Sequence, residues 1–191
     1  MKDFYKNIPG WFDFENIYED MVNKAPENAH FVEIGVWVGK SACFMGQLIK
    51  DSKKDIQFDC VDRFNHPGHM NVKAMVTEHG GQLGLFEHFM KEAGLDGYYK
   101  PVVSLSDEAA EKYEDGSLDF VWIDANHHPT AVKKDVEAWL PKVKKGGYIG
   151  GHDYYDNTNK KFHPMGKVIH EIFKIKNRSC FVAPSSWLVK I

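Results

Sequence analysis

The sequence contains little cysteine and no long apolar run. Its three cysteines, Cys43, Cys60 and Cys180, are odd in number and lack the spacing of a metal site, so we expect reduced, packed thiols. No stretch approaches the ~18 consecutive apolar residues of a membrane span. The opening stretch MKDFYKNIPGWFDFEN has neither the charged nor the apolar region of a signal peptide. These absences predict a cytoplasmic protein that does not enter a membrane.

An excess of basic residues is also lacking. The 191 residues carry a formal net charge of -3 and have an isoelectric point near 6.4, which argues against a nucleic-acid or anionic-membrane partner. With 43% hydrophobic residues and no internal repeat, the chain can bury one sizeable core. We therefore predict a single domain over residues 1–191 that binds small molecules. The sequence leaves the oligomeric state open, and a homodimer is compatible with it.

Short apolar runs alternate with helical patterns from His30 onward. This alternation is typical of repeated βαβ units and predicts an α/β protein with a parallel sheet. A lead-in segment over residues 1–28, with a helix near 13–22, precedes a core over 29–191. Strands are expected at residues 30–34, 57–61, 100–103, 118–123 and 148–151, and further helices begin near Lys40, Leu83, Ser106, Thr130 and Met165.

The C-terminal sequence SCFVAPSSWLVKI has a different pattern. Two apolar runs flank a Pro-Ser-Ser turn, which predicts a hairpin instead of another helical crossover. The stretch from Phe64 to Gln82 has no clean period and ends near the pair Gly80–Gly81. Irregular stretches of this length in compact domains are usually functional or mobile, so we expect a lid over residues 64–82.

Polar residues follow several of the predicted strands. Glu33 ends the first strand, Asp62 ends the second, and the sequences DANHH and GGHDYY lie at the ends of the fourth and fifth. In a doubly wound sheet, ligands bind beyond the carboxyl ends of the strands, along one rim. One acid at such an end can arise by chance, but acids at four ends predict a ligand-binding site.

The turn after the first strand has the pattern ExGxxxG, formed by Glu33, Gly35 and Gly39. Two glycines could simply make a tight turn, but they also allow the backbone to approach a ligand beside the donors of the next helix. Asp62 is placed to accept both hydroxyls of a ribose. The dinucleotide fingerprint GxGxxG is absent, which argues against NAD and favours a positively charged nucleoside without a pyrophosphate.

Together these motifs resemble the class I S-adenosylmethionine-dependent methyltransferases. The segments VEIGVWVGKS, FDCVD and LDFVWIDANHHPTAVKKDVEAWLPKVKKGGYIGGHDYY carry the resemblance, which extends from about His30 to Tyr154. The chain is most similar to the small metal-dependent O-methyltransferases, such as the catechol and macrolide-sugar O-methyltransferases. This resemblance implies a Rossmann-like, doubly wound, three-layer αβα fold. Its seven-stranded sheet would have the order 3-2-1-4-5-7-6, with strand 7 antiparallel.

The resemblance also implies how the rim holds the cofactor, S-adenosyl-L-methionine. Glu33, Gly35 and Gly39 would shape the pocket for its methionine part, and Asp62 would hold its ribose. Ser106 and Asp107 correspond to the adenine side. The alternative for these two residues is an ordinary helix start, with Ser106 as the N-cap and acids in the first turn.

The same resemblance implies a metal site and a base. Asp124 corresponds to the first metal ligand, beside the cofactor, and His127 to the general base of the sugar enzymes. A solvated loop is the alternative for His127 and for its neighbour His128. Where relatives have two oxygen ligands at the next strand end, this sequence has His152 and Asp153. If His152 binds the metal, its imidazole favours Mn²⁺, Fe²⁺ or Zn²⁺ over Mg²⁺; if it points elsewhere, the metal site is weak or absent.

The sequence therefore predicts a transferase that moves a methyl group to a hydroxyl of a small molecule, with a sugar as one acceptor class. Asp124 and His127 would be the catalytic residues, and a divalent cation would assist. Two alternatives remain. In a metal-independent methyltransferase acting on nitrogen or on an acidic oxygen, Asp124 and Asp153 would be structural. In a non-catalytic module, the chain would hold the cofactor without turnover.

Overall fold

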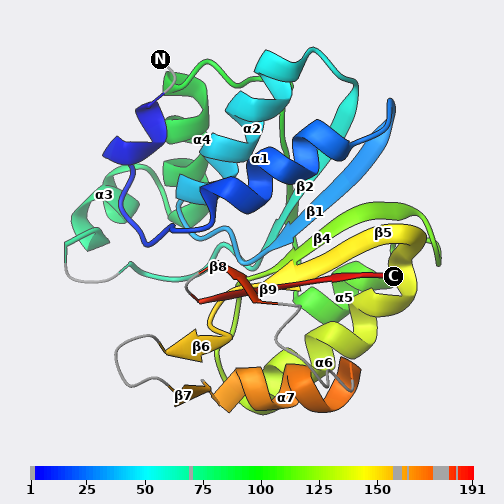
Figure 1. Cartoon of the computed structure of the whole chain (residues 1–191). Coiled ribbons are helices and arrows are strands. Elements are labelled where there is room, and N and C mark those ends of the chain that lie inside the picture. The colour runs from blue at the N-terminus through cyan, green and yellow to red at the C-terminus, as the bar shows by residue number, and fades with distance from the viewer. Residues whose placement is uncertain (1–2, 69–70, 157–160, 163, 174–180, 184) are drawn as a thin grey trace.

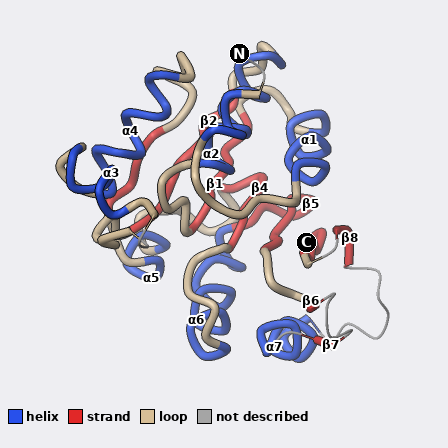
Figure 2. The backbone as a smooth tube through the Cα atoms, turned by 90° about the vertical axis from the view of Figure 1, so that its left-hand side faces the viewer, coloured by secondary structure: helices blue, strands red, loops and turns tan. Residues whose placement is uncertain are grey.

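The fold is a three-layer sandwich in which one twisted sheet lies between two layers of helices (Figure 1). The computed structural model describes residues 3–68, 71–156, 161–162, 164–173, 181–183 and 185–191. In the turned view of Figure 2, α5 and α6 again lie on the opposite side of the strands from α1 and α2. The predicted α/β class and three-layer arrangement are confirmed.

The central sheet has seven strands in the order β3-β2-β1-β4-β5-β9-β8. β9 runs antiparallel to both β5 and β8, while the pairs among the first five strands are parallel. Because β8 and β9 are the sixth and seventh strands of this sheet, the predicted order 3-2-1-4-5-7-6 is confirmed. The strands are β1 (Ala29–Ile34), β2 (Ile56–Asp62), β3 (Lys100–Val103), β4 (Leu118–Ile123), β5 (Val143–Gly151), β8 (Phe181–Ala183) and β9 (Ser186–Lys190).

Helices cover both faces of the sheet and bury two hydrophobic clusters. One layer contains η1 (Phe4–Asn7), α1 (Glu15–Lys24), α2 (Lys40–Ser52), α3 (Lys73–Glu78) and α4 (Gln82–Glu92). The other contains α5 (Ser106–Ala110), α6 (Pro129–Trp139), η2 (Leu140–Lys142) and α7 (Pro164–Phe173).

Side-chain alternation along the central strands explains this double burial. Phe120 and Trp122 of β4 pack into the first cluster, whereas Val121 and Ile123 pack into the second. Successive strand residues point to opposite faces of a sheet, so an almost continuously apolar strand must be covered on both sides.

Several boundaries differ from those predicted. β5 begins at Val143 instead of near residue 148, and the lead-in helix is shifted to Glu15–Lys24. The stretch 64–82 is not wholly irregular, because it contains α3, and its residues 69–70 lie outside the described part. A second, two-stranded sheet of β6 (Tyr155–Asp156) and β7 (Lys161–Phe162) is not predicted by the sequence. The lid role of 64–82 stays a prediction.

The interpretation of Ser106 as a helix N-cap is wrong. Leu105 occupies the N-cap position of α5, with no side-chain cap bond, and Ser106 is the first helical residue. Its hydroxyl instead accepts a hydrogen bond of 3.0 Å from Nε1 of Trp139 on α6. The serine therefore joins two helices of one layer.

The cysteines and the apolar character of the helices agree with the predictions from the sequence. Cys43 and Cys60 are buried free thiols, as predicted, and Cys180 lies outside the described residues. Among the described helices, none has the length and apolar character that crossing a membrane would require.

Candidate active site

Backbone pairing continues past the strand ends and brings the predicted site residues together. The amide of Gly35 donates to the carbonyl of Val61, and the amide of Asp124 donates to that of Ile34, each at 2.8 Å. The amide of His152 donates to the carbonyl of Ile123 at 3.2 Å. The residues that follow β1, β4 and β5 therefore lie side by side on one rim, as expected for parallel strands.

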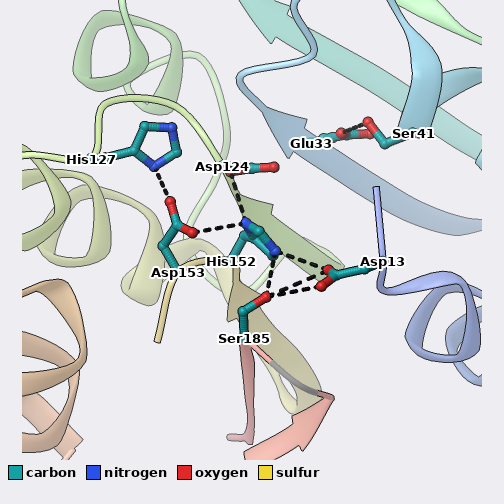
Figure 3. Close-up of polar contacts among 8 residues, drawn as sticks. All are labelled: Asp13, Glu33, Ser41, Asp124, His127, His152, Asp153 and Ser185. Carbon is teal, nitrogen blue, oxygen red and sulfur yellow. Dashed lines mark hydrogen bonds and ion pairs between the residues drawn. The ribbon is translucent and has the colours of Figure 1, made fainter. Parts of the chain in front are cut away.

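Asp124, His152 and Asp153 form a compact cluster on this rim (Figure 3). One ligand atom of each lies within 4.8 Å of those of the other two. Nδ1 of His152 is 3.2 Å from Oδ1 of Asp153 and 3.9 Å from Oδ1 of Asp124. Asp153 has a positive φ of 58°, a strained conformation for a residue with a side chain, of the kind that clusters at functional sites. The three residues predicted as metal ligands are thus brought together, and their metal role stays a prediction.

His127 reaches the same cluster from the loop after β4. Its Nδ1 lies 2.6 Å from Oδ2 of Asp153. Each oxygen of the Asp153 carboxylate therefore contacts one histidine, Oδ2 contacting His127 and Oδ1 contacting His152. This bond leaves Nε2 of His127 as the nitrogen that can accept a proton. His128 points elsewhere: its Nδ1 lies 2.8 Å from the Thr130 hydroxyl and its amide donates to Asn126, as in the structural alternative.

The groups of the cluster shift one another's pKa values. Burial raises the pKa of Asp124 to about 6, although the charges of His152 and His127 oppose the shift. Burial would lower the pKa of His152, but the hydrogen bond to Asp153 and the surrounding carboxylates raise it to about 9. The Asp153 hydrogen bond likewise raises the pKa of His127. Burial would raise the pKa of Asp153, but its bonds to the two histidines hold it well below its usual range. Strongly perturbed groups gathered on one rim are typical of a functional site.

Glu33 is a buried acid at the end of β1, with 1% of its surface exposed. Its Oε1 accepts a hydrogen bond from the Ser41 hydroxyl in the first turn of α2. Its Oε2 and the nearby Tyr18 hydroxyl are buried without a hydrogen bond of ordinary geometry among the described residues, although Tyr18 is close enough to oppose in part the rise in the pKa of Glu33 that burial causes. Burial, and the Asp124 charge to a lesser degree, raise the pKa of Glu33 to about 8 against the opposing effect of Ser41. An orphaned, buried carboxylate oxygen fits the ammonium group of a methionine moiety.

Gly35 and Gly39 both have left-handed backbones, with φ of 90° and 98°. A Cβ on Gly39 would stand 2.8 Å from the Phe86 ring of α4, and one on Gly35 would collide with the backbone of Asp124. Close packing against neighbouring elements therefore requires glycine at both positions, apart from any ligand.

Asp62, at the end of β2, supports two turns at once. Its Oδ2 accepts a hydrogen bond from the amide of Trp37, and its Oδ1 accepts one from the amide of Phe64, both at 2.9 Å. Both residues have positive φ, 46° and 51°, so the carboxylate holds two strained backbones in place. A carboxylate has about four lone-pair sites, so Asp62 retains the capacity to accept the two hydroxyls of a ribose.

Ser106 and Asp107 begin α5, just beyond β3. The amide of Ser104 donates to the carbonyl of Asp62 at 3.0 Å, which places this segment beside the end of β2. Asp107 forms an ion pair of 2.5 Å with Lys134. Both side chains thus have structural partners, and their adenine role stays a prediction.

Asp13 and Ser185 also belong to the site, although no sequence motif marks them. Oδ1 of Asp13 lies 2.9 Å from Nε2 of His152, and the Ser185 hydroxyl lies 2.6 Å from the same nitrogen (Figure 3). The pairing of Gly151 with Trp187 brings the turn before β9 beside the end of β5. Only the register of the hairpin could have indicated Ser185, and Asp13 gives no comparable signal.

Comparisons with known proteins agree with the fold. A family model described as a methyltransferase domain matches residues 32–154. The O-methyltransferase NovP has a similar fold, with a TM-score of 0.65 and 16% identity over 92% of this chain and 78% of NovP. A protein from Corynebacterium glutamicum has a TM-score of 0.65 and 14% identity over 98% of this chain and 85% of its own.

A third similar structure contains a ligand. SMU.1697c, a candidate methyltransferase from Streptococcus mutans solved in complex with SAH, has a TM-score of 0.59 and 8% identity. The match covers 94% of this chain and 98% of that protein. No curated protein matches the chain at a significant level.

Proposed function

Because the chain belongs to the methyltransferase domain family, we propose that it transfers a methyl group from S-adenosyl-L-methionine to a hydroxyl of a small molecule, with assistance from a divalent cation. A sugar hydroxyl is one acceptor class. The single observation that carries the metal-assisted chemistry is the cluster of Asp124, His152 and Asp153, whose ligand atoms lie within 4.8 Å of one another.

The residues of the rim fit both S-adenosyl-L-methionine and a divalent cation. The orphaned Oε2 of Glu33 suits the ammonium of the methionine part, and Asp62 has acceptor capacity for the ribose. Two carboxylates and an imidazole form a donor set for Mn²⁺, Fe²⁺ or Zn²⁺. When bound, the cofactor supplies an already activated methyl group, and the cation supplies Lewis-acid stabilisation of the acceptor oxygen.

The chain's own residues then have defined tasks. The rim must hold the acceptor hydroxyl in line with the methyl group and exclude water. Nε2 of His127 would accept the hydroxyl proton, because Asp153 holds the ring through Nδ1 at 2.6 Å. His127 and Asp153 thus form a base and its orienting carboxylate.

A methylation screen tests the proposal. Purified protein would be incubated with S-adenosyl-L-methionine and a panel of hydroxylated small molecules, with and without a chelator, and S-adenosylhomocysteine release would be measured. We expect turnover that chelation abolishes and that Mn²⁺, Fe²⁺ or Zn²⁺ restores before Mg²⁺. Turnover that survives exhaustive chelation would contradict metal assistance.

A metal-independent methyltransferase is the second candidate, and one observation favours it. Two neighbouring carboxylates repel unless a cation or a proton lies between them. The pKa of His152 is raised to about 9 by Asp153, Asp124 and Asp13 against the effect of burial, so a protonated imidazole can balance the cluster by itself. In that case the acceptor would be a nitrogen or an acidic oxygen. A non-catalytic module would bind S-adenosylhomocysteine but show no turnover in the same screen.

A further inference from the structure

The His152 ring presents its two nitrogens to different parts of the chain. Nδ1 faces Asp153 and Asp124, at 3.2 and 3.9 Å. Nε2 faces Asp13, which precedes α1, and Ser185, which precedes β9, at 2.9 and 2.6 Å. The segments before α1 and β9 therefore meet at one side of this ring (Figure 3).

Packing fixes the position of the ring, and hydrogen bonds fix its rotation. The side chain of His152 is 16% exposed, and its ring centroid lies 5.4 Å from that of Phe14. Phe14 itself is buried and packs on Trp122. Packing alone would still allow the ring to flip, and the polar contacts at Nε2 decide which nitrogen points to the cluster.

The contacts at Nε2 require a hydrogen on that nitrogen. Asp13 is a carboxylate and can only accept, so an unprotonated Nε2 would set a lone pair against Oδ1 at 2.9 Å. A hydrogen on Nε2 satisfies both Asp13 and the Ser185 oxygen. The Ser185 hydroxyl then donates to Oδ2 of Asp13, which lies 3.2 Å away. Nδ1 faces the carboxylate of Asp153 in the same way, at 3.2 Å, so without a cation it also carries a hydrogen, and a ligated cation would take the place of that hydrogen.

The hydrogen on Nε2 also excludes a hydrolase-like role for Ser185, His152 and Asp153. Ser185, His152 and Asp153 are arranged in the order of a Ser-His-Asp triad, in which the imidazole must take the serine proton through Nε2. Here Nε2 already carries a hydrogen that points to Asp13. Ser185 is therefore not an activated nucleophile.

We propose that Asp13 and Ser185 are positioning residues that keep the hydrogen of His152 on Nε2, so that Nδ1 is the atom that ligates a cation together with Asp124 and Asp153. This inference rests on the proposed metal-assisted function. Metal-bound histidines commonly donate their second ring N–H to a carboxylate, which fixes the tautomer and the ring orientation.

Titration of the purified full chain with Mn²⁺ tests the inference, by calorimetry or by electron paramagnetic resonance of the unbound ion. Loss of an outer hydrogen-bond partner typically weakens metal binding by roughly 10–100-fold, and we expect this for Asp13→Ala, with a smaller loss for Ser185→Ala. Asp20→Ala is the matched control, because it removes an exposed carboxylate of α1 that pairs with Lys24, and it should bind Mn²⁺ as wild type does. Thermal melting would check that each variant is folded.

Two further measurements separate positioning from a general structural effect. In Zn²⁺-loaded protein with ¹⁵N-labelled histidine, the nuclear magnetic resonance spectrum should show His152 with hydrogen on Nε2 and metal on Nδ1. In a His152→Asp background, which has no second ring nitrogen to orient, Asp13→Ala should no longer weaken Mn²⁺ binding.

The outcomes distinguish this inference from the function on which it rests. Wild-type Mn²⁺ binding that Asp13→Ala leaves within about twofold, well below the usual outer-shell effect, would overturn the positioning role alone. Ligation of Zn²⁺ through Nε2 would do the same. A wild type that binds no Mn²⁺ would overturn the metal role in the proposed function, and the inference with it.

Discussion

A Cβ atom on Gly35 would stand 2.3 Å from the backbone carbonyl oxygen of Asp124. Gly35 opens the turn that follows β1, and Asp124 is the first residue after β4. The expected cofactor turn and the carboxylate cluster are therefore in direct contact through their backbones, with no room between them for a side chain.

We expect Gly35→Ala to lower the free energy of unfolding by about 2–5 kcal/mol, from left-handed strain of about 1–2 kcal/mol and a clash of about 1–3 kcal/mol. Gly97→Ala is the matched control, because Gly97 has a similar φ of 86° and no atom within 4 Å of the added Cβ. It should lose only the strain, about 1–2 kcal/mol. Urea unfolding measures the free energy of unfolding of both variants. Equal losses would show that the contact with Asp124 does not contribute to the destabilisation.

Glu33→Gln should stabilise the ligand-free protein in a pH-dependent way. Burial raises the pKa of Glu33 from 4.5 to about 8, so the folded state holds this proton more tightly than the unfolded state. The stability that depends on this proton is fully present below pH 4.5 and is lost as the pH rises to about 8. The advantage of the glutamine variant should grow across that window and stay constant above it. Urea titrations at several pH values would measure the advantage, and a pH-independent difference would contradict the raised pKa.

Asp62→Ala should weaken the binding of S-adenosylhomocysteine by roughly 1.5–3 kcal/mol, because it removes charge-assisted bonds to two hydroxyls. The carboxylate also holds the amides of Trp37 and Phe64, so the variant should lose stability as well. Calorimetry would measure the affinity. Asp59→Ala serves as a control, since Asp59 lies on the same strand and binds His30 and Tyr113 instead. Binding of NAD in place of S-adenosylhomocysteine by the wild type would contradict the cofactor assignment.

His152→Asp should shift the metal preference towards Mg²⁺. The substitution exchanges an imidazole nitrogen for a hard carboxylate oxygen, the ligand type that Mg²⁺ favours. After chelation, Mn²⁺, Zn²⁺ and Mg²⁺ would each be added back separately to the wild type and to His152→Asp, and the activity restored by each metal would be compared. An unchanged order of preference would mean that His152 is not a ligand.

His127→Ala should lower the methyl-transfer rate by roughly 10²–10⁴-fold, the usual contribution of a general base. Metal binding should weaken by no more than roughly 10–100-fold, because His127 lies outside the three-residue ligand set and only orients the ligand Asp153. His128→Ala, next to it in the chain, is the control and should retain the wild-type rate. Complete loss of metal binding in His127→Ala would show that His127 is itself a ligand.

The sequence by itself determined the fold and the rim of the sheet. Short, nearly continuous apolar runs mark β1, β2 and β4 because each is buried on both faces. Parallel strands of this fold end on one edge, so Glu33, Asp62 and Asp124 could be assigned to one rim without coordinates. The hairpin that adds β9 was also predictable, since its turn is encoded locally.

Only the tertiary structure decided what surrounds His152. Asp13 and Ser185 reach Nε2 from segments that are distant in the chain, and neither carries a motif, because a single carboxylate or hydroxyl has no period or spacing of its own. The partners of Ser106 were likewise hidden: its local sequence favours a cap, but packing of α5 on α6 gives its hydroxyl to Trp139. Local patterns encode the backbone hydrogen bonds of strands and turns, whereas the hydrogen-bond partners of the His152 ring depend on contacts that exist only after the chain has folded.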